Sequence, residues 1–210
     1  MSDELKQVRD YWDQRARRAA DDCARIESGR KGQRLRFESF LRAHDLQGRS
    51  ILDIGCGVGD FFARLQANRL AAHYYGIDLS PEMIGRARER FPEGRFELGD
   101  AGTINRRFDY TVAFAIHNVK VEHGKGILER SLRQQFEICD VAAHISLLTD
   151  RYQGFDPHIQ AWRAEEILSL ALSITPYAAL RHDYLPNDFS LTLYRRPLID
   201  SDPSLTGDLS

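Results

Sequence analysis

Glycines and carboxylates recur at the ends of three expected strands, in a pattern that suits nucleoside binding. The first group is the segment DIGCGVG at residues 53–59, whose glycines permit positive φ angles and a close approach of the main chain to a ligand. Asp78 ends the next expected strand, where a carboxylate can accept from both hydroxyl groups of a ribose. Asp100 follows the third strand in the segment GDA. These residue types predict a nucleoside site at one edge of a sheet.

The spacing of the glycines disfavours a dinucleotide. A G-x-G-x-x-G fingerprint would need its third glycine at position 60, and Asp60 stands there. A carboxylate beside two phosphates would be repulsive. The phosphate-loop pattern G-x-x-x-x-G-K-[ST] is also absent. We therefore expect a cationic or zwitterionic nucleoside without a phosphate chain.

The segment DIGCGVG, the acid after the second strand and GDA after the third resemble the class I S-adenosylmethionine-dependent methyltransferases. The resemblance extends over residues 34 to 196, and the strings AIHNVK, LLT and HDYLPNDF resemble small bacterial members of unassigned substrate. It implies S-adenosyl-L-methionine as the cofactor and in-line transfer of a methyl group. A compact chain that lacks a large insertion and is not basic favours a small-molecule acceptor. A base is needed only if the acceptor must lose a proton.

The resemblance also implies roles for individual residues. Asp78 would hold the ribose and Asp100 the adenine amine. Tyr11, on a helix that would close over the cofactor, would lie against the sulfonium or an acceptor ammonium through cation–π attraction. The full set of expected cofactor-binding residues is Asp53, Gly55, Gly57, Asp78, Leu79, Asp100, Ala101, Ile116 and Tyr11. In that set Gly55 and Gly57 line the methionine portion, and Asp53 supports their loop.

The loop after the fourth strand is expected to lie beside the transferred methyl group. His117 is the candidate general base, since the ordinary histidine pKa of about 6.5 suits that role, and Asn118 is its neighbour at the expected catalytic position. Lys120, His182 and Tyr152 are candidates for binding the acceptor. The histidines show no metal-ligand spacing, so no metal is expected.

Strand and helix patterns alternate along most of the chain. Right-handed crossovers then predict an α/β fold with a seven-stranded, mostly parallel, doubly wound sheet and an antiparallel C-terminal hairpin. Strands are expected at 50–55, 73–78, 94–101, 108–118 and 140–149, with two more within 179–196. Helices are expected at 59–70, 80–91, 124–138 and 155–172. Ser80 and Pro81 mark a helix start.

Residues 1–46 are expected to form a helical cap, 47–196 the cofactor-binding domain and 197–210 a disordered tail. Leu5, Val8 and Trp12 have helical spacing, and the GRKG segment at 29–32 is expected to interrupt the helix. The charged residues of the first 36 positions are expected to form a solvated face.

The chain has 210 residues, a formal net charge of −2 and a pI near 6.4. That charge balance argues against a nucleic-acid partner, and no apolar run is long enough to suggest a membrane span. Three widely spaced cysteines and the absence of a signal-peptide pattern predict a reduced protein of the cytoplasm. The sequence does not indicate the oligomeric state.

Two alternative functions follow from the same residues. The fold also supports cyclisation or group transfer from S-adenosylmethionine, and the HNVK string after the fourth strand leaves that open. A cofactor-binding module without catalysis is the other alternative, because no residue is a definite base.

Overall fold

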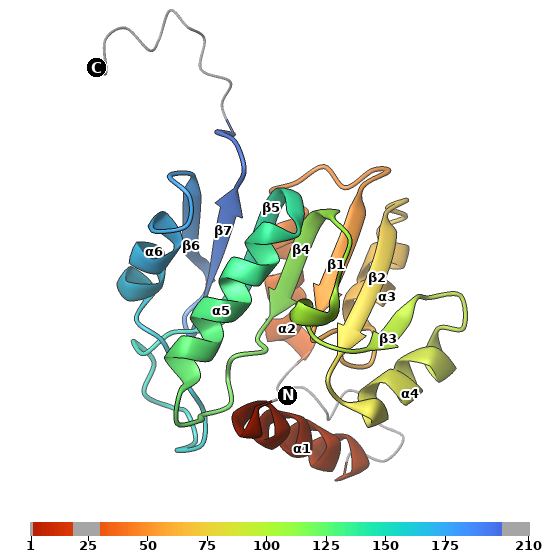
Figure 1. The fold of residues 1–210 in the computed structure, drawn as a ribbon, viewed down its shortest axis with the longest axis horizontal. Coiled ribbons are helices and arrows are strands. Elements are labelled where there is room, and N and C mark those ends of the chain that lie inside the picture. The colour runs from red at the N-terminus through yellow and green to blue at the C-terminus, as the bar shows by residue number, and fades with distance from the viewer. Residues whose placement is uncertain (1, 19–29, 199–210) are drawn as a thin grey trace, which may run out of the picture.

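The computed structural model describes residues 2–18 and 30–198 (Figure 1). All seven expected strands are present: β1 (Ser50–Ile54), β2 (His73–Asp78), β3 (Phe96–Leu98), β4 (Phe108–Phe114), β5 (Cys139–Leu148), β6 (Ala178–Leu185) and β7 (Asp188–Tyr194). The helices of the described residues are α1 (Asp3–Arg18), α2 (Arg30–Leu41), α3 (Asp60–Ala67), α4 (Pro81–Arg90), α5 (Gly124–Glu137), α6 (Ala164–Leu172) and the 3-10 turn η2 (Ala101–Thr103).

The strands form one seven-stranded sheet in the order β3-β2-β1-β4-β5-β7-β6. The pairs among β1 to β5 are parallel, whereas β7 pairs antiparallel with both β5 and β6. The strand order reverses between β1 and β4, and ligands of doubly wound sheets bind at such a switch point. The predicted fold class, including the antiparallel C-terminal hairpin, is confirmed.

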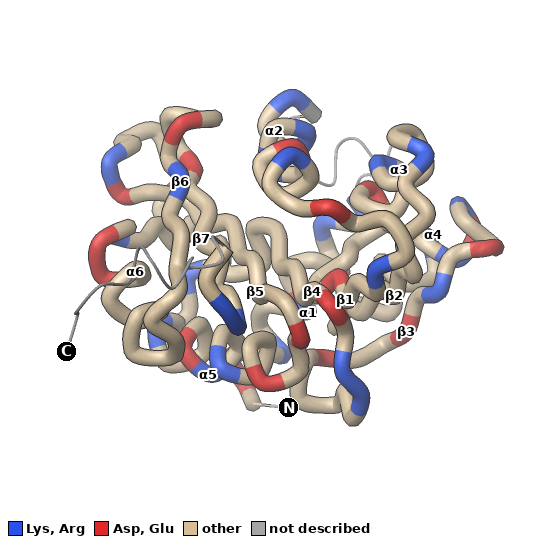
Figure 2. Tube along the Cα trace, turned by 90° about the horizontal axis from the view of Figure 1, so that it is seen from above, with Lys and Arg blue, Asp and Glu red and all other residues tan. Residues whose placement is uncertain are grey.

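Helices cover both faces of the sheet, with α5 and α6 on one side and α2 and α3 on the other (Figures 1 and 2). Strand β1 is therefore apolar on both faces. Its consecutive residues Ile51 and Leu52 pack in different hydrophobic cores. Leu128 of α5 packs in the core of Leu52, whereas Phe40 of α2 packs in that of Ile51. Figure 2 shows acidic and basic residues on the outer helices and loops.

Helix α4 begins as the sequence predicts. The Ser80 hydroxyl accepts a hydrogen bond from the Met83 N–H at 3.0 Å, and Pro81 occupies the first helical position. This cap fixes the chain directly after Asp78, at the carboxyl end of β2.

The expected helix at 155–172 is too long. Helix α6 starts only at Ala164, and the residues before it form isolated bridges, Val119 with Ile159 and Thr149 with Trp162. Pro157 lies in this stretch, and the residue before a proline disfavours helical backbone. The segment at 149–163 therefore returns to the sheet edge as a loop.

The expected break at 29–32 is also wrong in part, because α2 runs from Arg30 through Gly32. The solvated charged face is wrong for two residues, Asp13 and Arg36, which are 8% and 7% exposed. Both charges have buried partners, which compensate the cost of removing them from water.

Helix α1 lies across the carboxyl ends of the parallel strands (Figure 1). The cap boundary at 46 stays a prediction, although Phe37 and Phe40 of α2 pack inside the main body. The predicted tail falls mostly on residues 199–210, outside the described residues. Across the described ranges, no helix has the length and apolar character needed to span a membrane.

Candidate functional site

The turn after β1 depends on glycine. Gly55, Gly57 and Gly59 have φ angles of 71°, 54° and 83°, a region that residues with a Cβ rarely adopt. A Cβ on Gly55 would also lie 2.3 Å from Cγ2 of Ile116. The Gly55 and Cys56 N–H groups both donate to the Ile77 carbonyl, at 2.8 and 3.0 Å, which ties the turn to β2.

Asp78 joins this turn to the start of α4. Its Oδ2 accepts from the Gly57 N–H at 2.9 Å, and its Oδ1 accepts from the Ser80 N–H at 2.8 Å. Burial raises the pKa of Asp78, and these backbone hydrogen bonds act against the rise. A carboxylate has about four acceptor positions, so Asp78 keeps capacity for a ligand.

Asp100 caps η2 at the end of β3. Its Oδ1 accepts from the Gly102 N–H at 2.8 Å, and its Oδ2 has no hydrogen-bond partner among the described residues. Ala101 follows directly and is buried. Asp60, the residue that disfavours a dinucleotide, is paired with Arg90 and accepts from Gln33.

One cavity of about 560 Å³ joins these features at the carboxyl ends of the strands. Eleven of the expected site residues line it: Tyr11, Gly55, Gly57, Asp78, Leu79, Asp100, Ala101, Ile116, His117, Asn118 and Tyr152. The cavity also receives residues from α1, α2, α5 and the β6–β7 hairpin. Residues distant in sequence therefore share one site.

Three expected site residues do not line the cavity, namely Asp53, Lys120 and His182. Asp53 is 2% exposed and accepts from the Tyr74 hydroxyl at 2.7 Å, behind the glycine turn. Lys120 and His182 have exposed side chains, His182 on β6. Their roles stay predictions, because the three residues do not line the cavity.

The loop after β4 leaves the sheet through a strained residue. Ala115 has a φ of 60°, and its N–H donates to the Ser146 hydroxyl at 3.1 Å. Strained non-glycine residues of this kind concentrate at functional sites. The strain directs the chain into Ile116 and His117, which both line the cavity.

His117 and Asn118 carry polar atoms that are shielded and unpaired. His117 Nε2 and Asn118 Oδ1 have no hydrogen-bond partner among the residues that the structure describes. Burial lowers the pKa of His117 to about 4, so its imidazole is neutral at pH 7. The His117 carbonyl accepts from the Trp162 indole N–H at 3.0 Å, which fixes this loop against the 149–163 segment.

The wall opposite the sheet is formed by α1. Its apolar residues Leu5, Val8 and Trp12 line the cavity, and Tyr11 packs edge-on against Trp12 with ring centroids 5.3 Å apart. The Tyr11 hydroxyl lies 3.4 Å from His158 Nε2. Asp13 is hydrogen-bonded to the Ser80 hydroxyl, which connects α1 to the capped end of α4.

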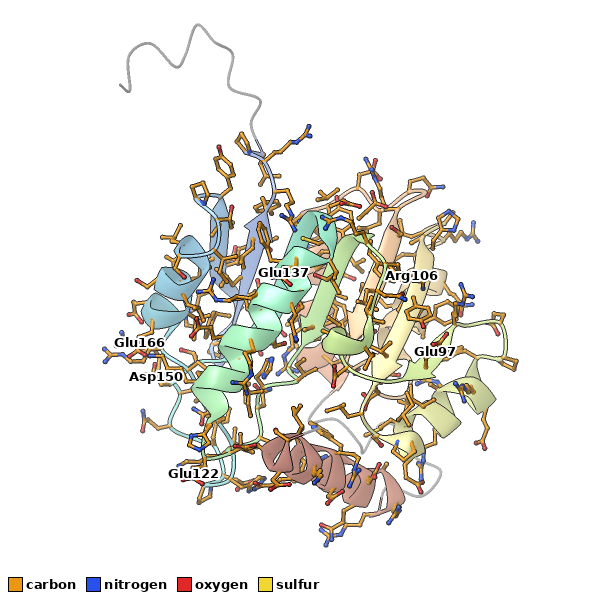
Figure 3. All side chains as sticks on the ribbon, in the orientation of Figure 1. Glu97, Arg106, Glu122, Glu137, Asp150 and Glu166 are labelled. Carbon is orange, nitrogen blue, oxygen red and sulfur yellow. The ribbon has the colours of Figure 1, made fainter. Side chains whose placement is uncertain are left out.

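The 149–163 segment completes the wall and is braced by charges. Arg163 lies 3.9 Å from both Asp150 and Glu166, which Figure 3 shows next to each other beside α6. Tyr152 from this segment is 42% exposed and packs edge-on against Phe155 at 4.9 Å.

Several residues of the cavity wall were not anticipated from the sequence. They include Arg36, Gln134, His158, Trp162, Leu185 and Asn187. Periodicity carries no signal for them, because loop folding and the pairing of α2 with the hairpin bring them to the cavity. No group of three or more His, Cys, Asp or Glu side chains in the described ranges has a metal-binding arrangement.

The chain is similar to known proteins in domain, sequence and fold. A family model for a methyltransferase domain matches residues 51–134. Trans-aconitate 2-methyltransferase of Variovorax paradoxus is 46% identical over 54 residues, which are 25% of this chain and 20% of that protein. Magnesium-protoporphyrin O-methyltransferase of Rhodobacter capsulatus is 34% identical over 94 residues, 42% of this chain and 41% of that protein.

The fold has a counterpart along almost the whole chain. The crystal structure of magnesium protoporphyrin IX methyltransferase from Synechocystis, solved with bound SAH, matches with a TM-score of 0.71 at 17% identity. That match covers 92% of this chain and 100% of the other. The chain spans less than half the length of the curated relatives it matches by sequence. Residues 51–134 thus match a methyltransferase domain, and the fold of the chain is that of solved S-adenosylmethionine-dependent methyltransferases.

Proposed function

We propose that the protein transfers a methyl group from S-adenosyl-L-methionine to a small molecule. The observation that carries the proposal is that the glycine turn, Asp78 and Asp100 converge on one cavity of about 560 Å³. Small-molecule and cofactor sites typically have volumes of roughly 300–1,000 Å³.

The residues present fit such a cofactor. Asp78 has acceptor capacity for a ribose diol, and the open Oδ2 of Asp100 suits the adenine amine. Leu79, Ala101 and Ile116 offer apolar surface to the adenine ring. Gly55 and Gly57 leave the main chain uncovered where the methionine portion would pass.

When bound, S-adenosylmethionine supplies an electrophilic methyl group. The contribution of the chain is to hold an acceptor in line with that group, and such positioning can lower a barrier by about 7–11 kcal/mol. The strained Ala115 and the Trp162 contact fix the Ile116–Asn118 loop for this purpose. Helix α1 and the 149–163 segment line the site and would limit the access of water to it.

We assign His117 the role of accepting a proton when the acceptor must lose one. Its imidazole is neutral because burial lowers its pKa to about 4, and its Nε2 has no partner within residues 2–18 and 30–198. That same low pKa makes His117 a weak base. An acceptor that is already ionised would need no base. Asn118 lines the cavity beside His117, where we assign it the orientation of the acceptor.

A small acceptor is supported by the enclosure of the cavity and by the relatives. Residues of α1 and of the 149–163 segment line a cavity of about 560 Å³, a size that suits a small acceptor. Two of the relatives are named for small acceptors, trans-aconitate and magnesium-protoporphyrin. A cytoplasmic location belongs to this proposal as well, supported by Cys56 and Cys139, which are free thiols.

Isothermal titration calorimetry followed by mass spectrometry tests the proposal. S-adenosylhomocysteine should bind at one site per chain, and acceptor incubations should yield methylated product with S-adenosylhomocysteine. Methylthioadenosine as the product would indicate the alternative sulfonium chemistry, and tight binding without turnover over a broad acceptor panel would indicate a binding module. Absence of binding would refute all three.

A further inference from the structure

Arg36 is a buried arginine that has no role in the proposed methyl transfer as described above. It lies on α2, is 7% exposed and lines the cavity together with Gly32 of the same helix. Burying a guanidinium is costly unless the charge is compensated. Its partners therefore indicate why it is there.

One edge of the guanidinium is held by a carboxylate. Arg36 Nε donates to Asp188 Oδ2 at 2.6 Å, and Asp188 at the start of β7 is fully buried. The Tyr184 hydroxyl donates to the other oxygen of Asp188. Burial raises the pKa of Asp188, whereas Arg36 and Tyr184 act against that rise. This network fixes the orientation of Arg36.

The other edge of the guanidinium is open. The bond through Nε is the only hydrogen bond that the Arg36 side chain makes to other described residues. Its terminal nitrogens have no partner among the described residues, and they are not shielded from solvent. Since Arg36 lines the cavity, these nitrogens are accessible from it.

Position places this open edge away from the adenine. Arg36 precedes Phe37, which packs in the core of α2 and α3, whereas Ala101 and Ile116 belong to the core on the other face of the sheet. A group bound at Arg36 thus lies beyond the methionine end of the nucleoside or in the acceptor space. A fixed guanidinium with open terminal nitrogens matches the geometry of a carboxylate.

We propose that Arg36 binds a carboxylate in the cleft, an inference that rests on the proposed methyltransferase function. Two molecules can supply it: the methionine portion of the cofactor, or a methyl acceptor that is an organic acid. Asp188 is a positioning residue in this scheme, because it holds the guanidinium without reaching the ligand.

The test compares S-adenosylhomocysteine with its decarboxylated analogue, which keeps the ammonium group. Arg36→Met alone would leave Asp188 buried without its charge partner, so the main variant combines Arg36→Met with Asp188→Asn. If the cofactor supplies the carboxylate, the unmodified protein should bind S-adenosylhomocysteine about tenfold to a hundredfold more tightly than the analogue. The double variant should bind the two alike.

A second arm titrates malonate and trans-aconitate into the protein, with and without S-adenosylhomocysteine. If the acceptor supplies the carboxylate, these acids should bind about tenfold more weakly to the double variant, while its preference between the two nucleosides is unchanged. Arg42→Met is the matched control, because Arg42 follows the same helix with 79% side-chain exposure and should alter neither arm.

Circular dichroism establishes that the double variant is folded. A folded double variant that matches the unmodified protein in both arms would overturn the role of Arg36. Failure of the unmodified protein to bind S-adenosylhomocysteine would instead refute the proposed function, and the acid titration without nucleoside would still decide the proposal for Arg36.

Discussion

At the scale of single residues, Asp78 connects structure and binding. Its carboxylate accepts one hydrogen bond from the N–H of Gly57, earlier in the chain, and one from the N–H of Ser80, two residues later. Asp78 also lines the cavity. The residue that would hold the ribose thus also fixes the glycine turn to the start of α4.

Asp78→Asn should weaken S-adenosylhomocysteine binding by about tenfold to a hundredfold. The amide removes the charge, and its NH2 group would face a backbone N–H donor where a carboxylate oxygen now accepts. Calorimetry measures the change. Asp109→Asn is the matched control, since Asp109 accepts from the Ser50 N–H and hydroxyl outside the cavity lining. It should lower the free energy of unfolding and leave the affinity intact. Equal affinities for Asp78→Asn and the unmodified protein would contradict the assignment.

His144 should make stability depend on pH. It is 1% exposed, its Nδ1 pairs with Thr192 Oγ1 at 2.8 Å, and burial lowers its pKa to about 3. Below the unfolded value of about 6.5 the unfolded chain binds a proton that the folded chain does not. The free energy of unfolding therefore falls as pH decreases from about 6.5, with a slope of at most about 1.4 kcal/mol per pH unit from this group.

Urea unfolding between pH 7.5 and pH 5, on the order of six conditions, measures this slope. His144→Gln should remove most of the contribution while keeping a partner for Thr192. Identical slopes in both proteins would show that His144 is not held neutral.

Two charged residues show what sequence patterns miss at this scale. Asp13 and Arg36 lie in a stretch rich in both charge signs, which favours a solvated face. Their burial depends on Ser80 and Asp188, residues far along the chain that only tertiary folding brings near. No local signal distinguishes them from exposed neighbours such as Arg42.

At the scale of elements, Ser80 couples two helices. Its hydroxyl accepts from Met83 at the start of α4 and is hydrogen-bonded to Asp13 of α1. Ser80→Ala should lower the free energy of unfolding by about 1–2 kcal/mol through loss of the cap. It should also speed amide exchange in α1, since Asp13 loses its partner.

Asp13→Asn separates the two effects, because it leaves the α4 cap intact. Hydrogen exchange should then increase in α1 but not in α4. Equal protection of α1 in all three proteins would mean that the Ser80 contact does not hold this helix over the cavity.

The elements that the sequence predicted best are those with local signals. Strands β1 and β2 are apolar runs that end in glycine or acid, and Ser80-Pro81 marks the start of α4. The start of α6 was missed, because the apolar residues from Phe155 to Trp162 have helical spacing but instead make cavity wall and bridges. Nine of the eleven expected site residues that line the cavity lie at or just after the ends of β1 to β4, where motif and strand end coincide.

At the scale of the molecule, binding in one enclosed cavity should stabilise the fold as a whole. At a S-adenosylhomocysteine concentration about 100 times Kd, the free energy of unfolding should rise by about 2.7 kcal/mol. For a chain of this size that corresponds to an increase in Tm of about 5–10 °C. Differential scanning calorimetry measures it. NAD is the control ligand and should give no increase, since Asp60 replaces the third glycine of a dinucleotide turn; an equal increase with NAD would contradict the selectivity.

The central claim is that the cavity at the carboxyl ends of β1, β2 and β4 holds an adenosyl sulfur compound. A crystal structure of the chain grown with S-adenosylhomocysteine tests it most directly. The expected result is one ligand with its ribose hydroxyls on Asp78, its adenine beside Asp100 and Ala101, and its sulfur near Gly55. Density for the ligand elsewhere, or a cavity filled by protein side chains in its presence, would contradict the account.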